Sequence, residues 1–388
     1  MKKVGILTHY HDTVNYGGAL QAYALCKVIE SLGYTCEQID IDCFAECVDL
    51  DYKPSFFKRL LKPILPIYKI FRRLFNHNNY KSKLILRNTW RKSFFVFTNT
   101  CIPHTDKQFD SKNISDISFM YDAFVVGSDQ VWNPIWYFEP FFLTFVPDSK
   151  PKIAYAASIA QNSLSEHTKE TFARNLKNFS AISVREKSAV TLLNNILSQD
   201  VQYTLDPTML LDVEQWEKIA VKNIVDVPYV FCYFLGNDKK MREAAMAFSS
   251  DRGLILVNIA HATAQFHTND IDFGDIIFDA PTPNEFLSLI KNADYIFTDS
   301  FHATAFSYIF KKQYFVFERE NYSGMSSRVK SLLDLFGLQN RLCDTSEQYI
   351  IDYIKSLSNI DYSENDEQFF NLKECSLQFL KDSLKSFQ

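Results

Sequence analysis

A single histidine, His302, lies between a strand-like apolar stretch and a short helix-like one. The surrounding sequence is DSFHATAFS, in which Asp299 or Ser300 is a suitable N-cap and two alanines leave space around the imidazole. A helix N-terminus disfavours an imidazolium ion, whereas a bound phosphate beside it would favour the proton. The pattern therefore predicts either a general acid that faces an anion or a buried histidine that closes the turn.

A glycine pair precedes the first predicted helix, in the sequence NYGGALQ. Asn15, Gly17 and Gly18 would let an anion approach the backbone at a helix N-terminus, or they would simply form a tight turn. The spacing differs from the GxGxxG pattern of dinucleotide-binding loops, so a dinucleotide site is disfavoured.

Polar side chains also end two other strand-like stretches. Ser128, Asp129 and Gln130 follow the apolar run FVV, and they would either bind sugar hydroxyls or cap the next segment. Arg185 and Glu186 follow the run AISV. An arginine at that place is either half of a structural ion pair or a planar fork for a carboxylate or phosphate.

These loops are positioned by an alternation of short apolar strands and helices. It begins with a strand over 4–8, a helix over 19–33 and a strand over 36–42, and it resumes after residue 122. Such alternation predicts an α/β protein with two Rossmann-like domains facing a cleft, as in glycosyltransferases of the B type, and ligands at the carboxyl ends of the strands. We predict an N-terminal domain over 1–207, a linker over 208–228, a C-terminal domain over 229–340 and C-terminal helices over 341–388.

One strongly basic segment interrupts the first domain. Residues 53–105 contain twelve Lys and Arg and no Asp or Glu, although the net charge of the 388-residue chain is −5. The segment is either a basic amphipathic element that faces anionic lipid through 53–92, or a helical hairpin packed on the domain. Its apolar residues recur at helical spacing, although two prolines interrupt them: Phe57, Leu60, Leu61, Ile64, Tyr68, Phe71 and Phe75. Nucleic-acid binding is disfavoured because the rest of the chain is acidic.

The N-terminal sequence MKKVGILTHYHD lacks the apolar core of a signal peptide, and no apolar run reaches the about 18 residues of a membrane-spanning helix. The eight cysteines form no Cys-x-x-Cys pair, which favours reduced core residues over metal ligands. We therefore expect a cytoplasmic protein, which the basic segment would place peripherally on the inner face of the cell membrane.

Seven motifs, taken in order, resemble the polysaccharide pyruvyl transferase family. They cover nearly the whole chain apart from the basic segment and the C-terminal helices. The motifs are NYGGALQAYAL (15–25), VVGSDQVWNP (125–134), YAAS (155–158), SVREKSA (183–189), TLDPTMLL (204–211), DSFHATAFS (299–307) and SSRVKSLLDLFGL (326–338).

The resemblance implies transfer of pyruvate from phosphoenolpyruvate onto two hydroxyls of a sugar as a ketal, with release of phosphate and without a metal or other cofactor. It implies an acceptor sugar such as galactose in a capsular or exopolysaccharide repeat unit, carried as a lipid-linked oligosaccharide. His302 matches the acid of the family, and Arg185 matches its donor-binding arginine.

The chain departs from the family pattern at position 300, where some members have an arginine and this chain has Ser300. We expect Arg328 to supply the missing charge. The remaining assignments are Asp129 as the base for the acceptor, Ser300, Asn15, Gly17 and Gly18 in the donor site, and Ser128 and Gln130 in the acceptor site.

Two other functions remain open at this stage. The same architecture would support a glycosyltransferase that uses a nucleotide sugar. A non-catalytic, membrane-associated scaffold would explain the missing arginine at position 300.

Overall fold

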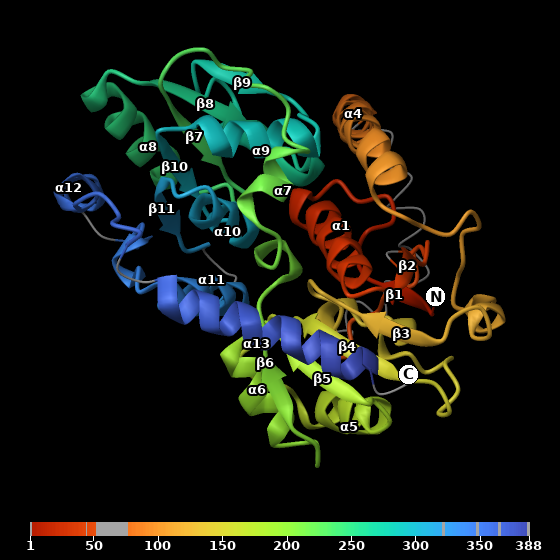
Figure 1. The fold of residues 1–388 in the computed structure, drawn as a ribbon. Coiled ribbons are helices and arrows are strands. Elements are labelled where there is room, and N and C mark those ends of the chain that lie inside the picture. The colour runs from red at the N-terminus through yellow and green to blue at the C-terminus, as the bar shows by residue number, and fades with distance from the viewer. Residues whose placement is uncertain are drawn as a thin grey trace, which may run out of the picture.

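The computed structural model describes residues 2–43, 45–51, 77–319, 323–346, 349–363 and 366–385. Two six-stranded sheets, both entirely parallel, form the two halves of the molecule (Figure 1). Most of their strands are short apolar runs that are buried between helices, whereas the edge strand over Ile276–Phe278 is largely exposed. The two parallel sheets confirm the predicted α/β class.

The first sheet has the order β2-β1-β3-β4-β5-β6. Its strands are β1 (Lys3–Leu7), β2 (Thr35–Gln38), β3 (Ala123–Val126), β4 (Lys152–Ala157), β5 (Ala181–Val184) and β6 (Val201–Tyr203). The helices that connect them include α1 (Tyr16–Ser31), α4 (His77–Cys101), α5 (Glu166–Leu176) and α6 (Lys187–Asn194).

The second sheet has the order β12-β11-β10-β7-β8-β9. Its strands are β7 (Tyr229–Tyr233), β8 (Ile255–Ile259), β9 (Ile276–Phe278), β10 (Tyr295–Thr298), β11 (Gln313–Phe317) and β12 (Leu342–Cys343). Its helices are α8 (Lys239–Arg252), α9 (Pro283–Asn292), α10 (Phe301–Ile309), α11 (Ser323–Phe336) and α12 (Ile350–Ser356).

The C-terminal region differs from the purely helical segment expected over 341–388. It begins with β12, which pairs with β11 and so extends the second sheet. A two-residue strand has no recognisable alternation, which is why the sequence pattern missed it. Between the sheets, the segment 208–228 contains the short helix α7 (Val213–Glu217), and the boundaries at 207, 228 and 340 stay predictions.

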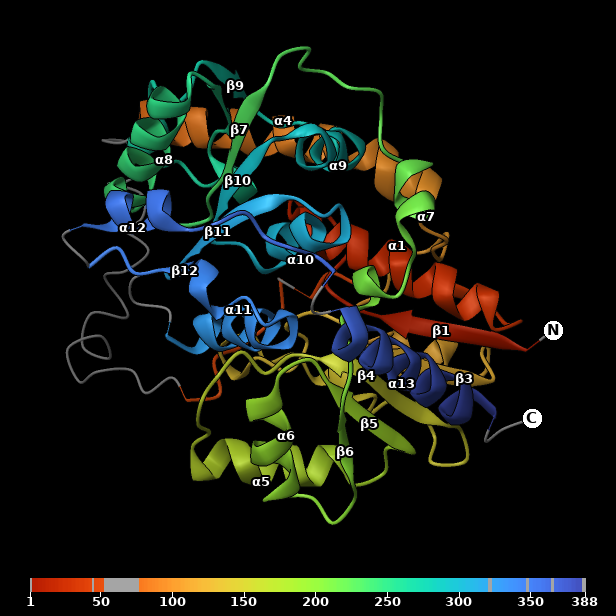
Figure 2. The same cartoon turned by 60° about the vertical axis from the view of Figure 1, so that its left-hand side comes forward.

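The last helix, α13 (Asp366–Lys385), returns to the first domain. It runs beside β4, away from α12 (Figures 1 and 2). The hydroxyl of Tyr34 donates to the carbonyl of Leu384 at 2.9 Å, and the backbone N–H of Leu205 donates to Ser376 Oγ at 2.9 Å. Since its Phe369 ring also lies 5.2 Å from the ring of Tyr308 in α10, the C-terminal helix contacts both halves of the molecule.

The described part of the basic segment is the helix α4, and residues 52–76, with all seven apolar positions noted above, lie outside the described residues. The buried face of α4 carries Trp90, Phe94 and Phe97. The ring of Tyr16, from α1, lies 5.6 Å from Trp90 and 4.9 Å from Phe94. Since α4 also contacts α9 and the turn over 262–264, it bridges both domains instead of belonging to the first alone.

Candidate active site

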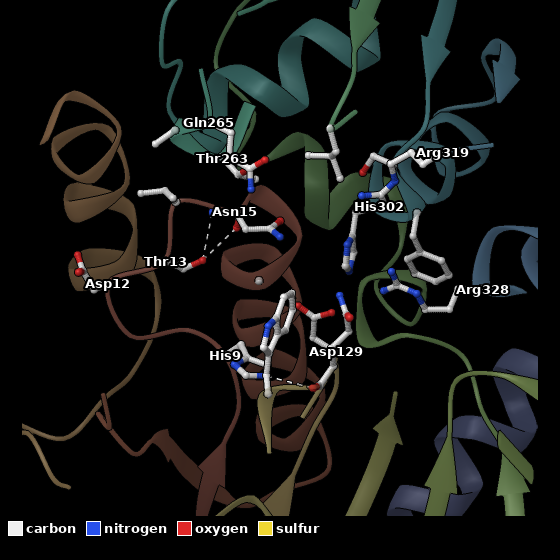
Figure 3. Close-up of a pocket in the computed structure, with 18 of the residues that line it drawn as sticks. His9, Asp12, Thr13, Asn15, Asp129, Thr263, Gln265, His302, Arg319 and Arg328 are labelled. Atoms are coloured by element: carbon white, nitrogen blue, oxygen red, sulfur yellow. Dashed lines mark hydrogen bonds between the residues drawn. The ribbon is translucent and has the colours of Figure 1, made fainter. Parts of the chain in front are cut away.

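A pocket of about 510 Å³ lies between the two domains, at the carboxyl ends of the strands, where parallel sheets usually bind ligands (Figure 3). Its first-domain wall comes from the loops after β1 and β3, and its second-domain wall from the loops after β7, β8, β10 and β11. Seven of the ten candidate residues line it: Asn15, Gly18, Asp129, Gln130, Ser300, His302 and Arg328. The other three, Gly17, Ser128 and Arg185, lie behind this wall.

His302 enters the pocket from the first turn of α10. Ser300 is the N-cap of this helix, and its hydroxyl accepts the Ala303 N–H at 3.4 Å. The imidazole is almost fully buried, and its Nε2 lies 3.5 Å from Oδ2 of Asp206. The predicted N-cap is confirmed, and His302 both lines the pocket and approaches a carboxylate.

Gly17 provides the space for the His302 ring. A Cβ built on Gly17 would overlap Nδ1 of the imidazole, so no other residue type fits at this position without displacing the ring. The preceding Asn15 caps α1, because its side-chain oxygen accepts the Gly17 N–H at 2.9 Å. The structure therefore places Gly17 against the histidine and not on the wall where a donor contact was expected.

Asp206 is the centre of a buried polar cluster that the sequence interpretation did not identify. It accepts hydrogen bonds from Nη1 of Arg185 at 2.6 Å, Oγ of Ser128 at 3.0 Å and Oγ1 of Thr208 at 2.7 Å. Burial opposes its ionisation, but His302 and Arg185 lower the pKa of Asp206 far below its usual range. Asp206 follows the end of β6 by three residues, within the motif TLDP. A carboxylate at the carboxyl end of a strand is the sequence feature that could have identified it as a site residue.

Arg185 does not contact the pocket as expected of a donor-binding residue. Its side chain is 1% exposed, and its two terminal nitrogens bind Asp206 and, at 3.2 Å, Oδ1 of Asp129. The guanidinium carbon lies 4.3 Å from the centre of the Phe301 ring. The Glu186 carboxylate accepts a hydrogen bond from Ser158 and attracts the Arg185 charge, but the two side chains form no ion pair in the described structure. Arg185 thus binds one carboxylate behind the pocket, Asp206, and one on its wall, Asp129.

Ser128 also differs from its expected role at the acceptor. It is fully buried, and its hydroxyl contacts Ala156 O at 2.9 Å as well as the Asp206 carboxylate. The neighbouring Asp129 does line the pocket. Burial opposes its ionisation, but Arg185, His302 and His9 lower the pKa of Asp129, so its carboxylate is charged at neutral pH.

Two arginines reach the pocket from the second domain (Figure 3). Arg328, from α11, is 4% exposed, and its Nε has no hydrogen-bond partner. No ion pair of Arg328 is found in the described part of the chain, although the Glu186 and Asp129 carboxylates attract its charge. Burial, together with repulsion from Arg185, lowers its pKa to about 10, so it stays charged at neutral pH. Arg319 follows β11, and its Nε lies 3.8 Å from Oδ2 of Asp299. The sequence interpretation predicted Arg328 and missed Arg319.

The pocket thus combines a buried cation, an imidazole and an ionised carboxylate. Two facing Rossmann-like domains with a pocket between them define a protein of glycosyltransferase-B architecture. In fold, the chain is similar to UDP-GlcNAc 2-epimerase from Methanocaldococcus jannaschii, with a TM-score of 0.54 and 10% identity over 96% of this chain and 99% of that one. It is also similar to UGT89C1 from Arabidopsis thaliana, with a TM-score of 0.50 and 9% identity over 100% and 99%.

These identities show similarity of fold alone. A comparison with curated proteins gives no significant match. The family model for polysaccharide pyruvyl transferases, however, matches residues 15–321, and the chain therefore belongs to the polysaccharide pyruvyl transferase family. The predicted family is therefore confirmed, and the family consists of transferases, which confirms that part of the predicted enzyme class. Across the described ranges, no helix is both long and apolar enough to cross a membrane.

Proposed function

We propose that this protein transfers pyruvate from phosphoenolpyruvate to two hydroxyls of a sugar as a ketal and releases phosphate. The observation that supports the proposal best is Arg328, a buried guanidinium without a hydrogen-bond or ion-pair partner among the described residues, in the same pocket as His302. A buried charge without a partner is unfavourable unless a ligand neutralises it. The phosphate or carboxylate of phosphoenolpyruvate would do so.

Two of the arginines that line the pocket, both from the second domain, suit the two anionic groups of this donor. Arg328 and Arg319 both come from the second domain, and His302 lies beside them (Figure 3). Arginine binds carboxylates and phosphates through paired N–H groups, which also orients the ligand. Arg328 therefore takes the place of the arginine that is absent at position 300, and Arg319 adds a second charge.

The chemistry requires a proton donor near C3 of the donor. In the proposed reaction, His302 transfers its proton to C3, which turns the methylene into a methyl group and leaves a cationic centre at C2. One acceptor hydroxyl then forms a bond to C2 and loses its proton. The bond from C2 to the phosphate oxygen breaks with its electron pair, and a neighbouring hydroxyl closes the ketal and loses the second proton. One of these protons returns to His302, and the other leaves with phosphate or solvent.

Asp129 is the proposed acceptor base. Its low pKa makes it a weak base, but a hydroxyl that has attacked a cationic carbon is strongly acidic, so a weak base suffices. Gln130 lies beside it on the pocket wall and is the remaining candidate for the acceptor site. A hexose such as galactose, carried on a lipid-linked capsular or exopolysaccharide repeat unit, stays the proposed acceptor, and phosphoenolpyruvate is the only co-substrate proposed.

The test is thermal stabilisation of the purified protein by phosphoenolpyruvate and, separately, by UDP-GlcNAc. We expect stabilisation by phosphoenolpyruvate in the wild type, in His302→Ala and in the exposed control Arg174→Ala, and its loss in Arg328→Ala. At a ligand concentration about 100 times Kd, binding adds about 2.7 kcal/mol to the free energy of unfolding. Stabilisation by UDP-GlcNAc alone would instead support a nucleotide-sugar-dependent glycosyltransferase. Donor binding without acceptor-dependent phosphate release would support the scaffold.

A further inference from the structure

The outer face of helix α4 exposes large apolar side chains in two adjacent pairs. Leu84 and Ile85 are 47% and 66% exposed, and Phe95 and Val96 are 65% and 63% exposed. The pairs are 11 residues apart, which is about three helical turns, so they lie on the same side of the helix. Single exposed apolar residues are ordinary, whereas four on one helical face indicate a contact surface.

The orientation of this face is set by the packing of the opposite face. Trp90 and Phe94 are buried against Tyr16 of α1, and Phe97 lies 5.9 Å from the ring of Tyr23. The helix therefore cannot rotate its exposed pairs inward without removing these aromatic contacts. The outward face is a fixed feature of the fold.

The charged side chains of α4 within the described residues are all positive, and helical spacing places Lys92 on the same side as the apolar pairs. Lys83, Arg87 and Lys92 are exposed on α4, and Arg91 forms an ion pair with Asp12. The chain has no Asp or Glu from residue 52 to residue 105. A second copy of this chain bound symmetrically through the same face would place cations against cations, which disfavours a dimer there. A partner with an anionic surface and an apolar layer beneath it would contact both the cations and the exposed apolar side chains of α4.

We propose that the outer face of α4 docks the protein on an anionic lipid bilayer, with the helix lying in the plane of the membrane surface. Apolar side chains would enter the region beneath the headgroups while lysine and arginine contact the lipid phosphates. The proposal requires no spanning helix and does not depend on the chemistry proposed for the pocket.

Docking through this face would bring the pocket to the membrane surface. Arg87 of α4 lines the pocket, and so does Asp12, the ion-pair partner of Arg91. The same helix therefore contributes to the pocket wall and to the docking face. A substrate anchored in the bilayer could then reach the pocket while the protein remains bound.

The test is cosedimentation of the full chain with vesicles of phosphatidylcholine containing phosphatidylglycerol, compared with pure phosphatidylcholine. The test variant is Phe95→Ser with Val96→Ser. Its matched control is Phe119→Ser with Met120→Ser, an adjacent apolar pair that is 81% and 54% exposed outside α4. We expect binding of the wild type and the control to the anionic vesicles, weakening with salt, and a drop of about tenfold or more in the test variant. Lys92→Gln should reduce binding by about fivefold.

Three results would overturn the proposal. The first is wild-type protein that does not cosediment with anionic vesicles at low salt, and the second is equal binding by the test variant and the control. The third is a wild-type dimer, measured by light scattering, that the test variant dissociates, because a second copy would then cover the face. Thermal stabilisation by phosphoenolpyruvate is measured on the same variants, and we expect it to be unchanged. A protein that binds vesicles but not phosphoenolpyruvate would contradict the proposed function and leave the docking surface intact.

Discussion

His302 of the second domain lies directly against Gly17 of the first, at the start of helix α1, and a side chain on Gly17 would overlap the imidazole. The proposed acid is therefore positioned by both domains together. On its other side, Nε2 lies 3.5 Å from the carboxylate of Asp206. The position of the His302 imidazole therefore depends on how the two domains pack against each other.

Gly17→Ala should displace His302 and abolish most acceptor-dependent phosphate release. The clean measurement is a double-mutant cycle with His302→Ala, in which urea unfolding gives the free energy of each protein. With the imidazole present, the added methyl group should destabilise the fold. With His302→Ala, the same methyl group should be neutral or stabilising, since alanine favours helices by about 1 kcal/mol over glycine. A coupling energy near zero would show that the ring moves away freely.

Arg328→Met should stabilise the ligand-free protein while it removes donor binding. The substitution replaces a buried cation, unpaired among the described residues, by an apolar side chain of similar length, which we expect to raise the free energy of unfolding by about 1 kcal/mol. Arg242 is the matched control, because it is equally buried but its Nε donates to Asp270 at 2.9 Å. Arg242→Met should destabilise the protein by about 3 kcal/mol. Equal destabilisation in both variants would mean that Arg328 has a partner after all.

Asp206→Asn should be among the most destabilising single substitutions in the site. It removes the charge that Arg185 and His302 face, and leaves a buried guanidinium with Asp129 alone, so we expect a loss of about 3–5 kcal/mol in chemical denaturation. The control is Asp212→Asn, which breaks an exposed ion pair with Lys373 and should change stability by less than about 1 kcal/mol. Similar small losses in the two variants would argue against a cluster organised by Asp206.

Glu186→Gln should stabilise the protein at neutral pH but not under acidic conditions. Burial raises the pKa of the Glu186 carboxyl in the folded state, although Arg185 and Arg328 oppose the shift. A carboxyl with a raised folded pKa contributes stability below its unfolded pKa and loses it as the pH rises through the folded value. The glutamine side chain does not ionise, so the variant does not lose this stability as the pH rises. The stability difference between variant and wild type should therefore grow from about pH 4 towards neutrality, and a difference independent of pH would contradict the assigned ionisation.

Much of the fold was predictable from local patterns in the chain. Strands buried on both faces are continuous apolar runs, and the helices between them show their own period. The helix predicted over 19–33 is accordingly found as α1, Tyr16–Ser31. The strands β9 and β12 were missed because two or three residues carry no period. The crossing of α13 back to the first sheet was also missed, since it depends on contacts between residues as distant as Tyr34 and Leu384.

The place of the site was predictable for a related reason. Parallel strands bring their carboxyl ends to one edge of each sheet, so Asp129 had to lie at that edge of the first sheet, and Ser300 and His302 at that edge of the second. That the two edges face each other across one pocket depends on how the domains pack. Which side chains face the pocket was decided only by the tertiary structure. Arg185 is paired with Asp206, 21 residues away, whereas Arg328 is left without such a partner in the described structure. Ion pairing in a buried site depends on distances through space and on exclusion of water, and neither quantity is encoded in sequence spacing.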